Sequence, residues 1–391
     1  MLTHGLEAVV DRARGVRHDI HKHPELGFEE HRTQKVVMEW LKAYGYAPQE
    51  LAETGVVADL RPERGKTSRT VALRADLDAL PIREKTPLPY RSVHDGVSHK
   101  CGHDGHTAIL LATAAQLATH RHEVDGNVRL IFQPAEEGVR GGGAKVMVAE
   151  GVLDGVDEIY GLHNWPPFPK GEIRVKEGAT MAEVTSIDVR VEGKGGHASQ
   201  PHATRDTIVA ACQLVGAAQT IVARNLSTHE PAVLSFGTFH AGTVRNVIPQ
   251  RAELTGTLRT FDPETTKKVV ARLQSLAHHV GESMGVKIEV EIVPHYPALS
   301  SHARCVRAVE RVARRLVGEA AVSDRELPIT GGEDFAFYTQ KIPGAYFLVG
   351  AGRPGFETPG CHHPDFDFDD DLIDTGARMF LGLVQDRLEA S

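Results

Sequence analysis

The alternation of short apolar strands with helical segments in the first half of the chain most narrows the choice of fold. Apolar residues at helical spacing predict helices at Thr33–Tyr44 and His106–His120. Short apolar runs predict strands at Thr70–Leu77, Val128–Gln133, Ile159–Leu162 and, late in the chain, Ala345–Val349. Strands that alternate with helices fold as a sheet covered by helices, so we expect an α/β domain with a helix-covered mixed sheet.

Between Glu183 and Pro294 the pattern changes to strand, helix, strand, strand, helix, strand. The predicted elements are Thr185–Val191, Asp206–Arg224, Ala232–Phe239, Arg251–Thr260, Pro263–Met284 and Val286–Ile292. This βαββαβ order is that of the ferredoxin-like split βαβ fold. Because the α/β pattern resumes after Pro297, we expect residues 183–294 to form an inserted dimerisation or lid domain. Residues 1–182 and 295–391 are then the two parts of one catalytic domain.

The length and charge of the chain limit its partners. A chain of 391 residues can form more than one core, and its net charge of -8 provides no basic field for nucleic acid or an anionic membrane. Residues 1–19 lack an apolar export core, and no other apolar run is expected to approach a membrane span. We therefore expect a cytoplasmic protein with a small-molecule or peptide-like partner, and no nucleic acid or membrane.

Four cysteines, Cys101, Cys212, Cys305 and Cys361, are too few and too scattered for a disulfide scaffold. Free thiols or metal ligands are the better interpretation. Cys101 stands in Lys100–Thr107, a glycine-containing loop that also carries His103 and His106 and precedes a predicted helix. Thiolate and imidazole suit zinc and neighbouring metals, although a helix start with incidental histidines is the alternative.

A second candidate lies in Phe132–Gly138, where an apolar strand leads directly into Glu136 and Glu137. Ligands of open α/β sheets bind beyond the carboxyl ends of strands, so these carboxylates are expected at that edge. Pro134 ends the strand and frees both acids to approach one site. Two solvated surface acids are the alternative interpretation.

Histidines follow two more predicted strands. His163 lies at the end of the strand in Gly161–Pro166, and His362 lies in Cys361–Pro364, shortly after the strand that ends at Val349. Each alone is more often a packed or capping histidine. Several such segments at sheet ends together favour one shared metal site.

These motifs resemble those of the M20 metallopeptidase family, specifically its amidohydrolase branch with hippurate hydrolases, N-acyl-amino-acid amidohydrolases and plant auxin-conjugate hydrolases. The similarity extends nearly end to end. It covers His21–Glu30, Arg74–Pro81, Cys101–Thr107, Phe132–Gly138, Gly161–Pro166, Gly193–His202, Gly242–Pro249 and Gly331–Tyr338.

The resemblance implies two divalent metal ions per subunit, with Zn, Mn, Co and Ni all open, and Glu136 as the general base. The implied metal ligands are Cys101, His103, Glu137, His163 and His362. Asp76 and Asp78 are expected to orient the metal ligands without binding the metal themselves. His363 is an ambiguity that the family pattern His-x-Pro resolves in favour of His362. Cys361 is expected to be a buried thiol without a catalytic role.

The resemblance also implies substrate contacts from other segments. His197 would donate to the oxyanion, although a histidine that stabilises its own turn is the alternative. Asn246 and Arg259 match positions near a substrate carboxylate, which the guanidinium fork of an arginine suits, but an ordinary strand-surface arginine is nearly as good an interpretation. Gly331 and Gly332 would let the substrate backbone approach closely.

The expected reaction is hydrolysis of the amide of N-acyl amino acids of the hippurate or N-acetyl type. Glu136 accepts the proton of a metal-activated water and returns it to the leaving amine. A dipeptidase or carboxypeptidase with the same machinery is the alternative, and a non-catalytic metal-binding protein is a third. A phosphate-binding loop at Gly138–Lys145 is excluded because Val146 follows the lysine. The exposed edges of a four-stranded sheet favour a homodimer or higher oligomer.

Overall fold

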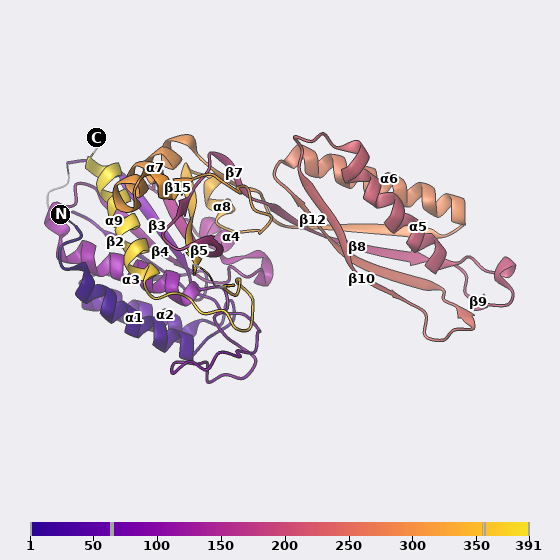
Figure 1. Cartoon of the computed structure of the whole chain (residues 1–391), viewed down its shortest axis with the longest axis horizontal. Coiled ribbons are helices and arrows are strands. Elements are labelled where there is room, and N and C mark those ends of the chain that lie inside the picture. The colour runs from indigo at the N-terminus through magenta and orange to yellow at the C-terminus, as the bar shows by residue number, and fades with distance from the viewer. Residues whose placement is uncertain (1, 63–65, 354, 356, 390–391) are drawn as a thin grey trace. The chain divides into compact units, whose positions relative to one another are not determined.

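The computed structural model describes residues 2–62, 66–353, 355 and 357–389. The chain forms two compact units (Figure 1). The first unit comprises Met1–Thr180, Ser300–Leu327 and Asp334–Ser391, and the second comprises Met181–Leu299 and Pro328–Glu333. Gly331 and Gly332, expected in the second part of the catalytic domain, thus belong to the second unit.

The first unit contains an eight-stranded sheet of order β1-β2-β4-β3-β5-β16-β6-β15. Its strands are β1 (Gln49–Leu51), β2 (Gly55–Leu60), β3 (Thr70–Asp76), β4 (Asn127–Gln133), β5 (Glu158–Pro169), β6 (Ile173–Arg174), β15 (Val322–Ser323) and β16 (Gly344–Gly352). Strands β4, β3, β5 and β16 are parallel neighbours, whereas β2 pairs with β4 antiparallel. The predicted mixed sheet is therefore confirmed.

Helices cover this sheet. They are α1 (Leu6–Lys22), α2 (His31–Ala43), α3 (His103–Thr119), α4 (Gly143–Ala149), α7 (Ala303–Val317), α8 (Ala336–Thr339) and α9 (Leu372–Glu389). Helix α3 contacts α1, α9 and β3, and its side chains are buried over almost its whole length. A helix that is apolar on all sides is typical of such a central position.

The second unit has a four-stranded antiparallel sheet of order β10-β12-β8-β13. Its elements are β8 (Glu183–Glu192), α5 (Thr207–Thr220), β10 (Ala232–Ala241), β12 (Arg251–Thr260), α6 (Pro263–Met284) and β13 (Lys287–Tyr296), with the short pair β9 (Gly196–His197) and β11 (Val247–Ile248). The predicted βαββαβ order is confirmed. Both helices begin where expected because Asp206 and Asp262 accept backbone N–H groups of the first turn.

A further short pair, β7 (Gly178–Met181) with β14 (Leu299–Ser301), stands where the chain passes between the units. Pro328–Glu333 is tied to the second unit by backbone contacts. The N–H of Ala182 donates to the carbonyl of Gly331 at 2.9 Å, and Met181 forms a bridge with Ile329.

Two element boundaries differ from the sequence prediction in ways that matter for the site. Helix α3 starts at His103 rather than His106, because Gly102 adopts a φ of 105° and turns the chain directly into the helix. Strand β5 continues past Leu162 to Pro169, since β16 pairs alongside it with a bulge between Gly350 and Gly352. His163 therefore lies within a strand rather than at its end.

The expectation that no apolar run approaches a membrane span is wrong for one segment. Thr207–Asn225, which is α5 with the π-helical turn that follows it, is long and apolar enough to pass a test of length and composition. In the structure its inner side chains, including Leu214 and Ala218, are buried in the core of the second unit. Helices in the cores of other proteins can also be this long and apolar, so length and composition alone are weak evidence for a membrane span.

Candidate metal centre

Cys101, His103 and His163 bring a thiol and two imidazoles together in the first unit. One potential ligand atom from each lies within 4.8 Å of the others, and all three residues are buried. The Sγ of Cys101 is 3.3 Å from Nε2 of His163. The three residues come from the turn before α3, the first turn of α3 and strand β5, so the fold assembles this cluster from separate segments.

Glu136, Glu137 and His362 meet the same cluster. Nε2 of His103 lies 4.0 Å from a carboxylate oxygen of Glu136 and 4.0 Å from one of Glu137. Glu137 Oε1 is 3.2 Å from Nε2 of His362, and these two residues group with Cys101 within 4.8 Å. Both acids that follow β4 thus reach one site after Pro134.

The donor atoms fit a pair of divalent ions. Among the described residues, Nε2 of His103 and Oε1 of Glu137 are buried polar atoms that form no hydrogen bond of good geometry. A buried polar atom without a partner is costly unless an ion or water satisfies it. Thiolate, imidazole and carboxylate are together the donors of late first-row metals such as zinc, with tolerance for manganese and cobalt.

Two aspartates lie behind these atoms. Asp78 Oδ1 is 3.1 Å from Nδ1 of His103, and its Oδ2 accepts the backbone N–H of Glu137 at 2.9 Å. Asp78 therefore orients two of the expected ligands at once and leaves Nε2 of His103 facing the centre. Asp76 contacts Nδ1 of His106 at 2.7 Å instead, and the other ring nitrogen of His106 contacts Asn164. With both nitrogens engaged, His106 is a supporting residue.

The pKa values of the two imidazoles are shifted in opposite directions. Burial lowers the pKa of His103, but the carboxylates of Asp76 and Asp78 outweigh it and leave the pKa well above its usual value. Burial and the neighbouring His106 hold the pKa of His163 well below its usual value. The pKa of Cys101 is raised, first by its contact with the Cys361 thiol and then by burial.

Two residues next to the site hold a backbone conformation that L-amino acids rarely adopt. Ala135, just before Glu136, has a φ of 51°, and His362 has a φ of 68°. Gly27 permits the first of these, because a Cβ at Gly27 would meet the Cβ of Ala135 at 2.9 Å. Such strain persists only where surrounding contacts enforce it, and it often accompanies functional sites.

Glu30 is a supporting residue that the sequence analysis did not single out. Its carboxylate is buried and accepts the backbone N–H of Ala135 at 2.8 Å and the hydroxyl of Thr54. Glu30 thereby holds the loop that carries Glu136. Its only sequence signal was its place at the end of the His21–Glu30 motif.

A buried network under the site was also missed. The guanidinium of Arg74 donates to Asp76, to Gln133 and to Asp334, while Gln133 donates to both oxygens of Asp334. Asp334 in turn accepts the N–H of Ala144 at the start of α4. Asp334 lies in the Gly331–Tyr338 motif, but nothing in the motif indicates that it bonds to a residue 260 positions earlier in the chain.

The remaining expected site residues belong to the second unit. His197 is exposed in β9, opposite Val247 of β11, and the carbonyl of Asn246 accepts the N–H of Ala198 at 3.0 Å. The backbone N–H of Ser199 donates to Nδ1 of His197 at 3.1 Å. Nδ1 is therefore the acceptor, which leaves the proton of a neutral ring on Nε2.

Arg259 and Gly332 lie together elsewhere in the second unit. A Cβ at Gly332 would stand 3.4 Å from Nη1 of Arg259 and 2.1 Å from a methyl of Val184, so only glycine fits there. Arg259 donates to Thr257 and, within the described part of the chain, forms no ion pair. Burial lowers its pKa. A half-buried guanidinium without an acidic partner is suited to an anionic ligand.

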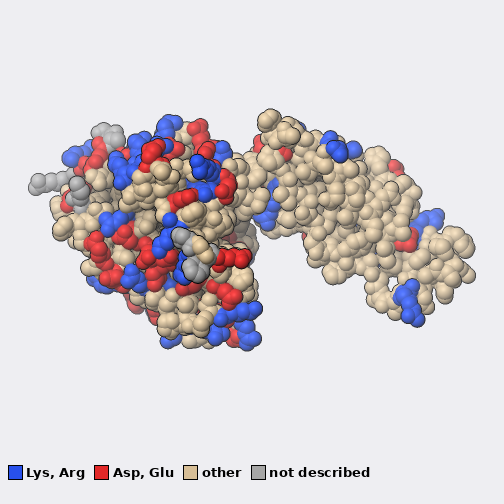
Figure 2. Space-filling model, in the orientation of Figure 1, with Lys and Arg blue, Asp and Glu red and all other residues tan. Residues whose placement is uncertain are grey.

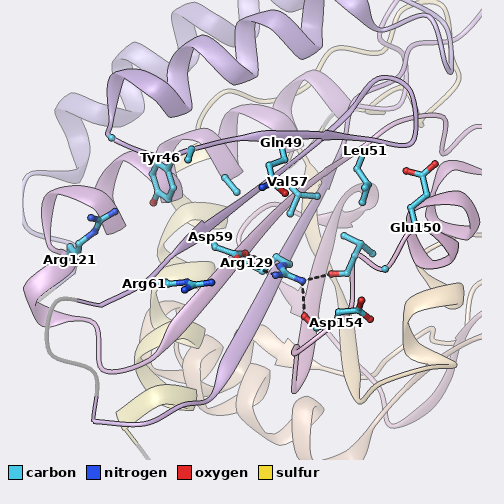
Figure 3. Close-up of a pocket in the computed structure, with 15 residues that line it drawn as sticks. Tyr46, Gln49, Leu51, Val57, Asp59, Arg61, Arg121, Arg129, Glu150 and Asp154 are labelled. Carbon is cyan, nitrogen blue, oxygen red and sulfur yellow. Dashed lines mark hydrogen bonds and ion pairs between the residues drawn. The ribbon is translucent and has the colours of Figure 1, made fainter.

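A cavity of about 490 Å³ in the first unit does not coincide with this centre (Figure 3). It is lined by residues of β1 and β2 and by the segment after α4, with no histidine or cysteine in its wall. Arg129 within it donates to both oxygens of Asp59 and to the carbonyls of Val152 and Asp154. With its donors used in this way, Arg129 is a structural residue.

Comparison with known proteins gives consistent matches along the chain. The model of Peptidase family M20/M25/M40 matches residues 72–386. An N-acetylcysteine deacetylase of Bacillus subtilis (strain 168) is 40% identical over 375 residues, covering 95% of this chain and 96% of that protein. A hippurate hydrolase of Campylobacter jejuni is 36% identical and covers 94% of each chain.

A solved structure agrees with these matches. A Bacillus subtilis protein described as a dinuclear metal binding peptidase from M20 family superposes with a TM-score of 0.84 at 36% identity, covering 98% of this chain and 100% of that one. Sequence and fold agree over nearly the whole length, and the chain belongs to peptidase family M20/M25/M40.

Proposed function

We propose that this protein hydrolyses the amide bond of N-acyl amino acids, of the N-acetyl or hippurate type, with two bound divalent metal ions. The observation that carries the proposal is the convergence of a thiol, three imidazoles and a carboxylate beside a second carboxylate, Glu136. The deacetylase and the hydrolase to which the chain is similar act, by their names, on an N-acetyl amino acid and on hippurate. The metal identity stays open among Zn, Mn, Co and Ni.

The proposed metal ligands are Cys101, His103, Glu137, His163 and His362. When bound, the ions would lower the pKa of a coordinated water and polarise the amide carbonyl. Glu136 then acts as general base, taking a proton from the attacking water and delivering it to the amide nitrogen as the carbon–nitrogen bond breaks. Asp78 keeps His103 and Glu137 in place through its two hydrogen bonds.

Substrate contacts are proposed for residues of the second unit. The protonated Nε2 of His197 is suited to stabilise the oxyanion, because Ser199 holds the ring by its other nitrogen. Arg259 and Asn246 would bind the carboxylate of the amino acid, and Gly331 and Gly332, which carry no side chain, would let its backbone approach closely.

The test compares two adjacent carboxylates. Glu136→Gln should keep the metal content of the wild type and lose roughly 10²–10⁴-fold in kcat, the usual range for general base catalysis. Glu137→Gln should lose metal as well as activity. Metal is measured by mass spectrometry of the dialysed protein, and rate by release of free amino acid from N-acetyl and N-benzoyl amino acids. Near-normal turnover by Glu136→Gln would remove the proposed base.

A dipeptidase or carboxypeptidase activity is the second candidate, since the matched family is one of peptidases. The same assay decides between them when free dipeptides and blocked peptides are added to the substrate panel. Preference for free dipeptides identifies a dipeptidase, preference for blocked peptides identifies a carboxypeptidase, and preference for N-acetyl or N-benzoyl amino acids identifies an amidohydrolase.

We also propose that the second unit serves as a dimerisation or lid domain, and that the protein is a homodimer. Of the two edge strands, β13 carries exposed charges such as Lys287 and Glu289, which discourage pairing. Strand β10 has none and exposes Val233 and Phe239. The adjacent helix α5 has no charged residue, and Figure 2 shows few charged side chains over that part of the second unit. An uncharged edge beside an apolar helix suits a second copy.

A cytoplasmic location is the accompanying proposal. All four cysteines are free thiols, which is the usual state in a reducing compartment.

A further inference from the structure

Cys361 stands directly against the proposed ligand Cys101, although the reaction requires nothing of it. Its Sγ is 3.6 Å from the carbonyl oxygen of Cys101, so the side chain of Cys361 lies against that residue. The N–H of His362 donates to the carbonyl of Lys100 at 2.6 Å. This bond joins the peptide group that follows Cys361 to the one that precedes Cys101. Cys361 and Cys101 therefore flank the same backbone hydrogen bond, which keeps the two residues next to each other.

The two thiols differ in access. Cys101 is 7% exposed, whereas Cys361 is only partly buried and lies at the margin of the core. The amide of Asn164 donates to Cys361 Sγ at 3.7 Å, which holds the side chain on the Cys101 side. A small oxidant can therefore reach Cys361, with Cys101 behind it as the second thiol.

We propose that Cys101 and Cys361 form a redox pair that closes to a disulfide when Cys101 holds no metal. Hydrogen peroxide oxidises Cys361 to a sulfenic acid and is itself reduced to water. The Cys101 sulfur then attacks the Cys361 sulfur, the S–O bond breaks, and a second water leaves. Two thiols and one peroxide thus give one disulfide and two waters, and a thiol reductant reverses the change.

The consequence of this disulfide rests on the proposed function. A sulfur in a disulfide is no longer a thiolate donor, so the oxidised protein cannot rebind its full set of ions. A bound ion, in turn, occupies the Cys101 thiolate and withholds it from Cys361. Metal loading and formation of this disulfide are therefore mutually exclusive.

The test uses the full-length protein after metal removal with a chelator and dialysis. After one equivalent of hydrogen peroxide, the number of free thiols should fall from four to two, and peptide mapping without reductant should show Cys101 linked to Cys361. Dithiothreitol should restore all four thiols and the capacity to bind zinc. Cys212, which is exposed, and Cys305, which is buried, serve as internal controls and should stay reduced.

Two variants separate pairing from general oxidation. Cys361→Ser should fold normally by circular dichroism, bind zinc, and still bind zinc after the same peroxide treatment. Cys361→Ala repeats the test without a polar side chain. Isolated Cys361 oxidation with Cys101 still a free thiol in the metal-free wild type would overturn the redox pair.

Zinc-loaded wild-type protein completes the design. Absence of the Cys101–Cys361 link in the zinc-loaded protein supports both the redox pair and the ligand role of Cys101. Disulfide formation at the same rate with and without zinc would support the redox pair but count against Cys101 as a metal ligand. Failure of the inference and failure of the proposed function can therefore be told apart.

Discussion

Single side chains around the centre matter as much for orientation as for ligation. Asp78 contacts the ring of His103 and the backbone N–H of Glu137, which are two of the expected ligands. Glu30 has the same role for Ala135, whose positive φ turns Glu136 toward His103. Residues of this kind affect the reaction by orienting other side chains. Substituting them therefore changes reaction rate or stability rather than the number of metal ligands.

The orientation of His197 leads to a kinetic prediction. His197→Ala should lower kcat by roughly 10²–10³-fold, the usual cost of losing one oxyanion donor, with a much smaller change in KM. Ser199→Ala should lower kcat by a smaller factor, because the ring loses the Ser199 hydroxyl at Nδ1 but keeps the backbone N–H at the same atom. Steady-state kinetics on one N-acetyl amino acid measures both. An effect confined to KM would argue against an oxyanion role.

Glu30 makes stability depend on pH. Burial, reinforced by the charge of Asp78, raises its pKa from 4.5 to about 8. As pH rises, the unfolded chain releases this proton before the folded one does. The stabilisation is therefore fully present below pH 4.5 and is lost as pH rises through about 8.

Glu30→Gln cannot ionise and should escape this loss. Between about pH 5 and pH 8 its free energy of unfolding should fall less than that of the wild type. Urea unfolding of the chelated proteins at the two pH values measures the difference. Parallel pH profiles for the two proteins would mean that Glu30 is not protonated in the folded state.

At the scale of elements, the site depends on where parallel strands end. Strands β3 and β4 are parallel neighbours, and the residues just after them, Asp78 and Glu136, meet at the same edge. Helix α3 begins at that edge, and Gly102 turns the chain so that Cys101 and His103 enter it. The centre is therefore a product of strand order and of one helix start.

Helix α5 provides the prediction at this scale. Val209 is 50% exposed on its uncharged outer face. Val209→Lys should convert a dimer into monomers, because burying an unpaired ammonium in an apolar interface is costly. Light scattering after size-exclusion chromatography measures the mass. Val93→Lys, which alters an equally exposed valine of the first unit, is the matched control and should leave the mass unchanged.

At the scale of the whole molecule, the described residues form two hydrophobic cores, one in each unit. All five proposed metal ligands lie in the first unit, whereas the proposed substrate contacts lie in the second. Metal binding should therefore stabilise the two cores unequally.

Removal of metal by a chelator tests this asymmetry. A ligand at 100 times its Kd stabilises the state that binds it by about 2.7 kcal/mol. Removal of metal should therefore lower the free energy of unfolding of the first unit by at least about this amount. Hydrogen exchange measured by mass spectrometry should accelerate in α3 and stay nearly constant in α6. Equal acceleration in both helices would show that the metal stabilises the two units together.

Part of the order of elements followed from the sequence alone. Local periodicity predicted β3, β4 and the six elements of the second unit, because an apolar face repeats every two residues in a strand and about every 3.6 in a helix. Side-chain chemistry likewise restricted the site to thiol, imidazole and carboxylate donors. These are properties of neighbouring residues, which a sequence displays directly.

Only the tertiary structure decided which residues meet. The pairing of Arg74 with Asp334, the bond from Ala135 to Glu30 and the contact of Cys361 with Cys101 join residues more than 100 positions apart. Such contacts depend on strand order and on burial, because partners are selected by the space and the unsatisfied donors that the completed fold leaves.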